Sequence, residues 1–255
     1  MEVRLYALLV IYNRACEDSP SVMQLAASPE ARAVIVDNST EPNRNAAFCA
    51  ARGFGYISMG GNLGLAKAYN RGIAFLKAHT DATHAVLLDD DTTLPDNFRE
   101  EMTAAVERHG ESDVFLPRVY DEKGLLSPCR IEGLRVSRVD DPSELTRETL
   151  TGINSGMTVA LSLFSDYTYD EGYFLDYIDH AFLRDMKKRD VLFTVTRLTL
   201  RQRFAANARG ARKAARIRFR IFKKDFRRFC GSSFKGRLTA EAVIMRRRIR
   251  VWLSR

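Results

Sequence analysis

Three consecutive acids, Asp89, Asp90 and Asp91, follow a short apolar segment at residues 84–88. Polar residues and a proline bound that segment, which is typical of a buried β-strand. Carboxylates crowded at a strand end repel one another and lose hydration, and Mg²⁺ or Mn²⁺ relieves both costs. Because ligands of open α/β sheets bind beyond the carboxyl ends of strands, such a cation could hold a substrate diphosphate. The alternative is a solvated acidic turn that caps a helix starting near Leu94.

The elements that must position these acids alternate between strand and helix. Apolar periodicity and turn residues predict strands at residues 3–12, 33–36, 55–59, 85–88, 114–117 and 191–195. Helices are predicted at residues 21–27, 45–52, 65–78, 95–108 and 173–189. Residues 121–150 are polar and predict loops and short strands. This alternation favours an α/β fold with a mostly parallel, Rossmann-like sheet.

The composition is that of a soluble globular protein, with 45% hydrophobic and 28% charged residues among 255. The four cysteines are far apart and form no CxxC pair, as expected of reduced thiols in a cytoplasmic protein. The four histidines are scattered and predict no zinc site. The apolar stretch Leu5–Tyr12 is too short to span a bilayer and has no small-residue cleavage site, so a first strand is expected there.

Charge divides the chain into two parts. Residues 1–196 hold 20 Lys and Arg against 30 Asp and Glu, a net charge of −10. Residues 197–255 hold 20 Lys and Arg against two acids, a net charge of +18. This asymmetry predicts one domain over residues 1–200 and a basic helical tail over residues 201–255 that meets something anionic.

The tail has apolar residues at helical spacing among its basic residues. One stripe consists of Ala215, Phe219, Phe222, Phe226 and Phe229. A second helix is expected to start at Thr239 and to carry Met245, Ile249, Trp252 and Leu253 on one side. This pattern predicts contact with an anionic membrane surface through residues 211–253. The alternative is that the Phe stripe packs on the catalytic domain. Nucleic acid is not expected, because no zinc finger or RNP-like motif is present.

Several motifs occur in a fixed order along residues 3–204. They are Val10–Asn13, Val36–Ser39, Asn62–Ile73, Leu88–Thr92, Gly152–Met157 and Tyr169–Asp179. This series resembles family 2 glycosyltransferases of the GT-A fold, especially the rhamnosyltransferase-like branch that builds bacterial surface polysaccharides. The resemblance implies transfer of a sugar from a dTDP- or UDP-sugar donor.

The resemblance assigns donor contacts to the first motifs. Asp37 would accept a hydrogen bond from the imide N–H of uracil or thymine, and Tyr12 could pack on that ring. The alternative for Asp37 is a turn-forming role. Asn62, Gly64 and Lys67 belong to a glycine-rich loop and the helix after it, whose N–H groups favour phosphate. Asn62 and Lys67 could each equally be structural.

The acidic triplet corresponds to the DxD motif of that family. Asp91 would ligate Mg²⁺ or Mn²⁺, and Asp89 would contact the donor ribose or the metal through water. Asp90 occupies the variable middle position on the donor side. Bound there, the metal neutralises the departing diphosphate.

The later motifs correspond to the acceptor side. Asp179 aligns with the base that takes the acceptor proton. Asp176 lies three residues earlier and would share a helical face with it. The alternative is that both acids interact only with a helix dipole. Asn154, Ser155 and Gly156 resemble the acceptor loop, with Gly156 allowing a tight turn.

Two positions depart from the family pattern. Ala181 stands where many members carry another acid, and no histidine follows His180, although many members complete the metal site with a late histidine. Gln202, in a Leu200–Phe204 segment, is expected to take that place or to leave an extra water on the metal.

The hypothesis is an inverting transferase that extends a glycan or polyprenyl-linked acceptor at the inner face of the cell membrane. Rhamnose is the first candidate sugar, with galactose or galactofuranose as alternatives. A catalytically degenerate binding module and a nucleic-acid-binding tail are the competing hypotheses.

Overall fold

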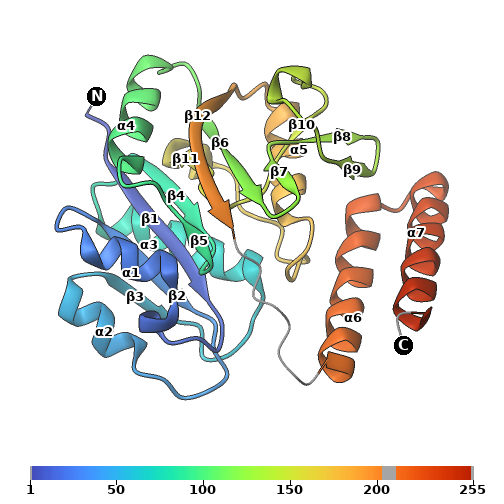
Figure 1. Cartoon of the computed structure of the whole chain (residues 1–255), viewed down its shortest axis with the longest axis horizontal. Helices are drawn as coiled ribbons and strands as arrows, with labels where there is room; N and C mark the ends of the chain where they lie inside the picture. The colour runs from blue at the N-terminus through green and yellow to red at the C-terminus, as the bar shows by residue number, and fades with distance from the viewer. Residues whose placement is uncertain (1, 203–210, 254–255) are drawn as a thin grey trace.

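The structure is a computed structural model that describes residues 2–202 and 211–253 (Figure 1). Its main sheet has nine strands in the order β3-β2-β1-β4-β11-β6-β12-β5, with β7 paired to β6. These strands are β1 (Leu5–Ile11), β2 (Ala33–Asp37), β3 (Gly55–Ser58), β4 (His84–Leu88), β5 (Thr92–Thr93), β6 (Val114–Asp121), β7 (Gly124–Ser127), β11 (Thr158–Ala160) and β12 (Phe193–Gln202). A small sheet contains β8 (Cys129–Glu132), β9 (Arg135–Ser137) and β10 (Leu150–Thr151).

The helices are α1 (Pro20–Ala27), α2 (Asn45–Arg52), α3 (Leu65–His79), α4 (Phe98–Arg108), α5 (Ile178–Lys188), α6 (Ala211–Cys230) and α7 (Phe234–Leu253). Strand β1 pairs in parallel with β2 and β4, β2 with β3, and β6 with β12. Strand β11 runs antiparallel between β4 and β6. The predicted α/β fold with a mostly parallel sheet is confirmed.

The register of the central strands brings the polar strand ends together. Ile11 at the end of β1 pairs with Asp37 of β2, and Leu9 pairs with Leu88 of β4. Asp89 follows Leu88 directly, so the ends of β1, β2 and β4 share one edge of the sheet. This is the edge at which an open α/β sheet binds ligands.

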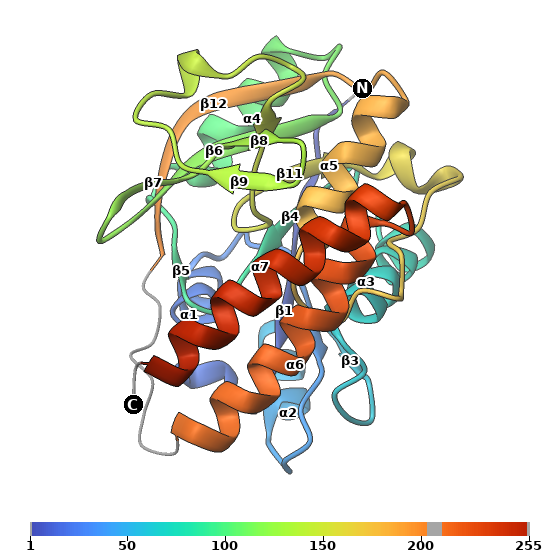
Figure 2. The same cartoon turned by 90° about the vertical axis from the view of Figure 1, so that its right-hand side faces the viewer.

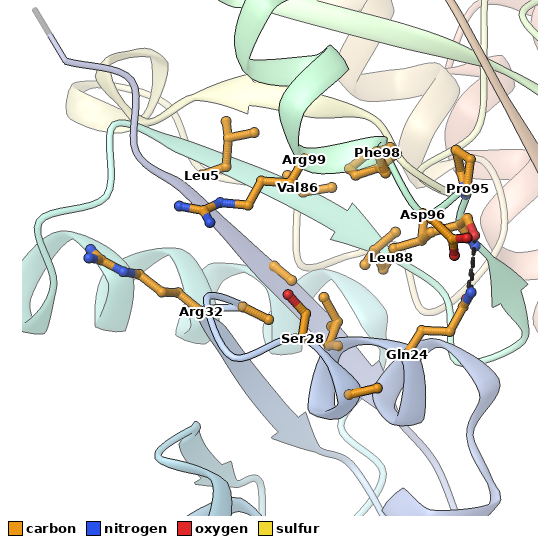
Figure 3. A pocket seen from close by; sticks show the side chains of 15 residues that line it. Leu5, Gln24, Ser28, Arg32, Val86, Leu88, Pro95, Asp96, Phe98 and Arg99 are labelled. Carbon is orange, nitrogen blue, oxygen red and sulfur yellow. Dashed lines mark hydrogen bonds between the residues drawn. The ribbon is translucent and has the colours of Figure 1, made fainter.

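Buried side chains fill both faces of the sheet. One core joins the sheet to α3, α5 and α6 and includes Tyr69, Phe182 and Phe226. The other lies under α1, α2 and α4. On that second face, a pocket of about 300 Å³ opens between α1 and α4 (Figure 3), and its apolar lining includes Leu25 and Phe98. No predicted site residue lines this pocket.

The basic tail forms two adjacent helices, with α7 on the outer side of α6 (Figures 1 and 2). Phe222, Phe226 and Phe229 are only 2–3% exposed and belong to the catalytic domain's core. The prediction that this stripe faces lipid is therefore wrong, and the alternative of packing on the catalytic domain is confirmed. Burial against tyrosines of the domain, such as Tyr177, removes these rings from water more completely than a surface position would.

Helix α4 begins at Phe98, three residues after its predicted start, and two other helix starts differ from the predictions by five residues. Helix α5 begins at Ile178 rather than near residue 173, because Tyr177 has a left-handed backbone (φ 62°). Helix α7 begins at Phe234, so Thr239 lies inside it and donates its hydroxyl hydrogen bond to the Lys235 carbonyl at 2.9 Å.

Three residues predicted for the apolar side of the second helix, Ile249, Trp252 and Leu253, have side chains outside the described part of the structure. Within residues 2–202 and 211–253, no helix has the length and apolar character needed to cross a membrane.

Candidate active site

Two of the three consecutive acids meet at one amide beyond the end of β4. The Gln202 side chain, at the end of β12, donates from Nε2 to Asp89 Oδ2 and to Asp91 Oδ1, both at 3.1 Å. Strand β12 reaches this point because it pairs with β6 along its length and with β5, which directly follows the triplet. The sequence prediction that Gln202 lies at the acidic cluster is therefore confirmed in position, while its role stays a prediction.

Asp89 carries an unfavourable charge. Its Oδ2 also accepts a hydrogen bond from Ser155 Oγ. Burial, together with the charges of Asp91 and Asp179, raises the pKa of Asp89 to about 6 against the effect of that hydrogen bond. A buried carboxylate with two acidic neighbours is better satisfied by a cation than by neutral donors.

The residues present fit a hard divalent cation. Gln202 Oε1 is buried and has no hydrogen-bond partner among the described residues, while its Nε2 faces the two carboxylates. Exchanging the amide O and N by a rotation of the side chain would present three oxygens to one point. Mg²⁺ is commonly held by one or two carboxylates together with water and substrate phosphates. No group of three or more His, Cys, Asp or Glu side chains suited to a metal occurs in the described residues.

Asp90 turns away from this pair. Its carboxylate lies 3.3 Å from the Arg14 guanidinium, and its carbonyl accepts from Arg14 at 3.1 Å and from Ser19 Oγ at 2.7 Å. Ser21 Oγ also lies 2.6 Å from the Asp89 carbonyl oxygen. Residues at the start of α1 thus hold the acidic loop, a role that no sequence motif indicated. The donor-side role of Asp90 stays a prediction.

Asp37 is buried in a polar cluster at the end of β2. Its carboxylate accepts from Asn45 Nδ2 and Tyr56 Oη at 3.0 Å and from the Ser39 N–H at 2.9 Å. Burial would raise the pKa of Asp37, but hydrogen bonds from these three residues lower it overall. The group stays anionic, as an acceptor for an imide N–H must. Tyr12, at the end of β1, is 51% exposed and available to a ring.

The glycine-rich loop is held by a residue that the motif analysis did not single out. Asn38 donates to Asn62 Oδ1 at 3.2 Å and accepts from the Leu63 N–H at 2.9 Å. Gly64 has a φ of 94°, and a Cβ there would lie 3.1 Å from the Phe174 carbonyl oxygen. Gly64 therefore allows the loop to approach residues 174–176. Lys67 is exposed on α3, and its contact with the donor stays a prediction.

Asp179 lies in the first turn of α5, close enough to the acidic cluster for its charge to raise the pKa of Asp89. Asp179 Oδ1 accepts from the His180 N–H at 2.7 Å, and the described residues donate no hydrogen bond to Oδ2. The His180 ring is turned toward Thr151 Oγ1, 2.8 Å from Nδ1. One carboxylate oxygen of Asp179 is thus available for another proton donor.

Asp176 does not share a helical face with Asp179, and this part of the prediction is wrong. Helix α5 starts at Ile178, so Asp176 lies before it. Its carboxylate forms an ion pair with Arg218 of α6, with Nη2 at 2.5 Å from Oδ1. Arg218 was overlooked because it was one of many basic tail residues.

The predicted acceptor loop lies beside the acids. Ser155 contacts Asp89, and Gly156 has a φ of 78°, as the predicted tight turn requires. Asn154 Oδ1 and the Tyr69 hydroxyl of α3 are buried without a hydrogen-bond partner in the described residues. Burial and the charges of Asp89 and Asp179 raise the pKa of Tyr69. Tyr69 falls at helical spacing with the apolar Leu65 and Ile73, so the sequence pattern gives no reason to single out its hydroxyl.

Comparisons with known proteins agree with this geometry. The family model described as glycosyl transferase family 2 matches residues 10–162. The dTDP-rhamnosyl transferase RfbF of Shigella flexneri is 24% identical over 185 residues, which cover 70% of this chain and 62% of that protein. The chain thus spans less than two thirds of that relative.

Solved structures share the fold. The S. aureus TarS 1–349 structure has a TM-score of 0.55 at 15% identity, covering 87% of this chain and 64% of that one. The same protein in complex with UDP has a TM-score of 0.55 at 12% identity, covering 95% and 70% of the two chains.

The chain belongs to glycosyl transferase family 2, and its architecture is the GT-A fold. The resemblance stated from the ordered motifs is confirmed at this level. The matched region contains the ends of β1, β2 and β4 and the acceptor loop before β11, whereas Asp179, Gln202 and the tail lie outside it.

Proposed function

We propose that this protein is an inverting glycosyltransferase that moves a sugar from a dTDP- or UDP-sugar to a glycan or polyprenyl-linked acceptor. The observation that carries the proposal is the meeting of Asp89, Asp91 and Gln202 at the carboxyl edge of the sheet, with Asp179 nearby. Family membership supports the donor class, because relatives are a dTDP-rhamnosyl transferase and a protein crystallised with UDP.

On the donor side, Asp37 would accept the imide N–H of the base and Tyr12 would cover the ring. Asp91, with Asp89 and the amide oxygen of Gln202, would hold Mg²⁺ or Mn²⁺ against the diphosphate. Bound there, the cation supplies neutralisation of the negative charge that develops on the leaving diphosphate. Asp89 is ionised above a pH of about 6, which its pKa sets, and can therefore take part near neutrality.

On the acceptor side, Asp179 would act as general base. Its free carboxylate oxygen takes the proton of an acceptor hydroxyl as that oxygen bonds to the anomeric carbon. The bond from this carbon to the diphosphate oxygen breaks, and its electron pair leaves with the diphosphate. Attack opposite the leaving group inverts the configuration at the carbon.

The test is release of nucleoside diphosphate from dTDP-rhamnose, UDP-galactose and UDP-galactofuranose, with Mn²⁺, by the wild type, Asp179→Asn and Asp185→Asn. Asp185 is a matched control because it is an acid of α5 whose ion pairs, within the described part of the chain, are with the same helix's Arg184 and Lys188. We expect one donor to be consumed, Asp179→Asn to be at least about 100-fold slower, and Asp185→Asn to equal the wild type. Equal rates for the two variants would reject Asp179 as base, and no consumption of any donor would reject the transferase proposal.

Rhamnose is the first candidate sugar because the relative's name specifies dTDP-rhamnose. In the panel above, preference for UDP-galactose or UDP-galactofuranose would reject this choice while leaving the transferase proposal intact.

We also propose that α7, rather than the Phe stripe of α6, meets an anionic membrane. Phe234, Leu238 and Met245 are 84%, 64% and 62% exposed and lie on one side of α7, opposite the buried Ala240 and Ile244. Exposed basic residues flank this apolar row: Lys235, Arg237, Arg246 and Arg248. Large exposed apolar side chains among arginines suit the boundary between headgroups and acyl chains.

Co-sedimentation with vesicles tests this surface. Binding to vesicles containing phosphatidylglycerol is expected for the wild type and for Met23→Glu, a control at an exposed apolar residue of α1. Leu238→Glu should reduce binding about tenfold, and vesicles of phosphatidylcholine alone should bind weakly. Equal binding of Leu238→Glu and the wild type would contradict the proposal.

A further inference from the structure

Helix α6 contains a buried acid that the reaction described above does not use. Asp225 is 0% exposed, although the tail around it is strongly basic. Its Oδ1 accepts from the Phe174 N–H at 3.0 Å, and its Oδ2 accepts from the N–H groups of Leu175 and Asp176 at 2.8 and 2.9 Å. Three successive amides thus converge on one carboxylate, an arrangement in which ionic hydrogen bonds are strong.

The segment held by Asp225 connects both sides of the candidate site. The Phe174 carbonyl accepts from the Leu65 N–H at 2.6 Å, next to Gly64 of the glycine-rich loop. Five residues after Phe174 along the chain, Asp179 lies in the first turn of α5. A displacement of residues 174–176 would therefore move the donor loop and the proposed base together.

Two further contacts join α6 to this segment. Arg218 binds the Asp176 carboxylate through both terminal nitrogens. Tyr177 directly precedes α5, and its ring packs on those of Phe226 and Phe229, with ring centres 5.0 and 4.9 Å away. Helix α6 therefore fixes three parts of this segment: the backbone of residues 174–176, the carboxylate of Asp176 and the ring of Tyr177.

The amides of residues 174–176 lie just before α5, which begins after the left-handed Tyr177. Their N–H groups are directed to Asp225, so residues 174–177 form a turn rather than helix. The turn places Asp179 in the first turn of α5, where a carboxylate is stabilised by the helix dipole. Without Asp225, these N–H groups would be free to join a longer helix and rotate Asp179.

We propose that Asp225 and Arg218 are positioning residues for sugar transfer, which makes α6 part of the active site. The proposal rests on the transferase function above and goes beyond it, because it concerns residues that touch neither donor nor acceptor. They set the backbone between the donor loop and Asp179. Misplacement of a reacting group by about 1 Å can cost on the order of 100-fold in rate.

The test compares Asp225→Asn, Arg218→Gln and Arg227→Gln in the full chain. Arg227 is the matched control, because it pairs with Glu241 of α7, at 2.7 Å, and does not touch residues 174–179. Each protein is measured for kcat and KM with the donor that the wild type consumes, and for dTDP and UDP affinity by thermal shift.

We expect kcat to fall about 100-fold in Asp225→Asn and about tenfold in Arg218→Gln, with nucleotide affinity within about threefold of the wild type. Arg227→Gln should keep the wild-type kcat. A kcat within threefold of the wild type in a folded Asp225→Asn protein would overturn the proposal. If Asp225→Asn shows no cooperative unfolding transition, Arg218→Gln decides, and an unchanged kcat there overturns it.

Failure of this proposal is distinguishable from failure of the transferase function. In the first case the wild type consumes a donor and the α6 variants do so equally well. In the second case the wild type itself neither consumes a donor nor is stabilised by dTDP or UDP.

Discussion

Two carboxylates, the half-buried Asp89 and the fully buried Asp225, contrast in how their charges are met. Asp89 receives two side-chain hydrogen bonds, faces the charges of Asp91 and Asp179, and has its pKa raised to about 6. Asp225 receives three backbone N–H hydrogen bonds from consecutive residues. The charge of Asp89 is poorly compensated in the folded chain. The charge of Asp225 instead holds the backbone of residues 174–176.

This difference separates a binding site from a structural anchor. A poorly compensated acid gains from a ligand, so folding leaves Asp89 and Asp91 ready for a cation. A fully hydrogen-bonded acid gains nothing further and loses much when replaced. Neutralising each acid should therefore have opposite effects on stability.

The largest expected effect is on catalysis at the cation site. Asp91→Asn should slow donor consumption about 1000-fold, because the residue proposed to bind the metal directly loses its charge. Without metal, the same variant should be as stable as the wild type or more so, since repulsion with Asp89 is removed. Asp96→Asn, at an exposed acid between β5 and α4, is the control and should change neither quantity.

The second-largest expected effect is a loss of folding stability when Asp225 is neutralised. Asp225→Asn should lower the free energy of unfolding by about 3 kcal/mol, because three N–H groups lose a charged acceptor and one faces an NH₂ group. Urea denaturation measures this quantity. Asp170→Asn, which removes an exposed partner of Arg228, should cost at most about 1 kcal/mol. If Asp225→Asn loses no more free energy of unfolding than Asp170→Asn, the contrast between Asp89 and Asp225 is contradicted.

The third effect is a dependence of stability on pH, measured in EDTA. The pKa of Asp89 is raised to about 6 in the folded state, so the folded protein holds a proton that the unfolded chain releases near pH 4. Stability from this group is therefore greatest at low pH and falls as pH rises from about 4 to 6, by roughly 2–3 kcal/mol. Subtracting the pH–stability profile of Asp89→Asn from that of the wild type isolates the contribution of Asp89. Identical profiles for the two proteins would contradict this prediction.

The smallest effect concerns Gln202. Gln202→Ala should weaken Mn²⁺-dependent stabilisation by dTDP about tenfold, since one oxygen ligand is lost. Gln202→His should retain it, because an imidazole nitrogen can ligate Mn²⁺. If Mn²⁺-dependent binding of dTDP is as tight in Gln202→Ala as in the wild type, then Gln202 is not a ligand and Asp89 and Asp91 are the protein ligands of the cation.

The meeting of Asp37 and Asp89 at one edge of the sheet could be predicted because its signals are local, and their roles toward a donor stay predictions. Asp37 and Asp89 each follow a short apolar run, and parallel strands bring such ends to one edge whatever the rest of the chain does. Gln202 also lies at the acidic cluster, as one of the two alternatives for the Leu200–Phe204 segment requires, while its role stays a prediction.

The acceptor side depends on contacts between distant segments. Asp225 and Phe174 are 51 residues apart, and no spacing rule relates them. Helical periodicity alone favours a helix from residue 173, whereas in the structure residues 174–176 donate to Asp225 of α6 and the helix begins at Ile178. The Phe stripe has the same pattern whether it meets lipid or a protein core, so only tertiary structure distinguishes the two.

The most direct test of the account is the affinity of dTDP and UDP, measured by titration calorimetry with and without Mn²⁺, for the wild type and Asp91→Asn. The account predicts that Mn²⁺ tightens binding of one nucleotide to the wild type by at least about tenfold and leaves Asp91→Asn unaffected. Nucleotide binding that is equally tight with and without Mn²⁺, or equally enhanced in Asp91→Asn, would contradict a cation site at these acids.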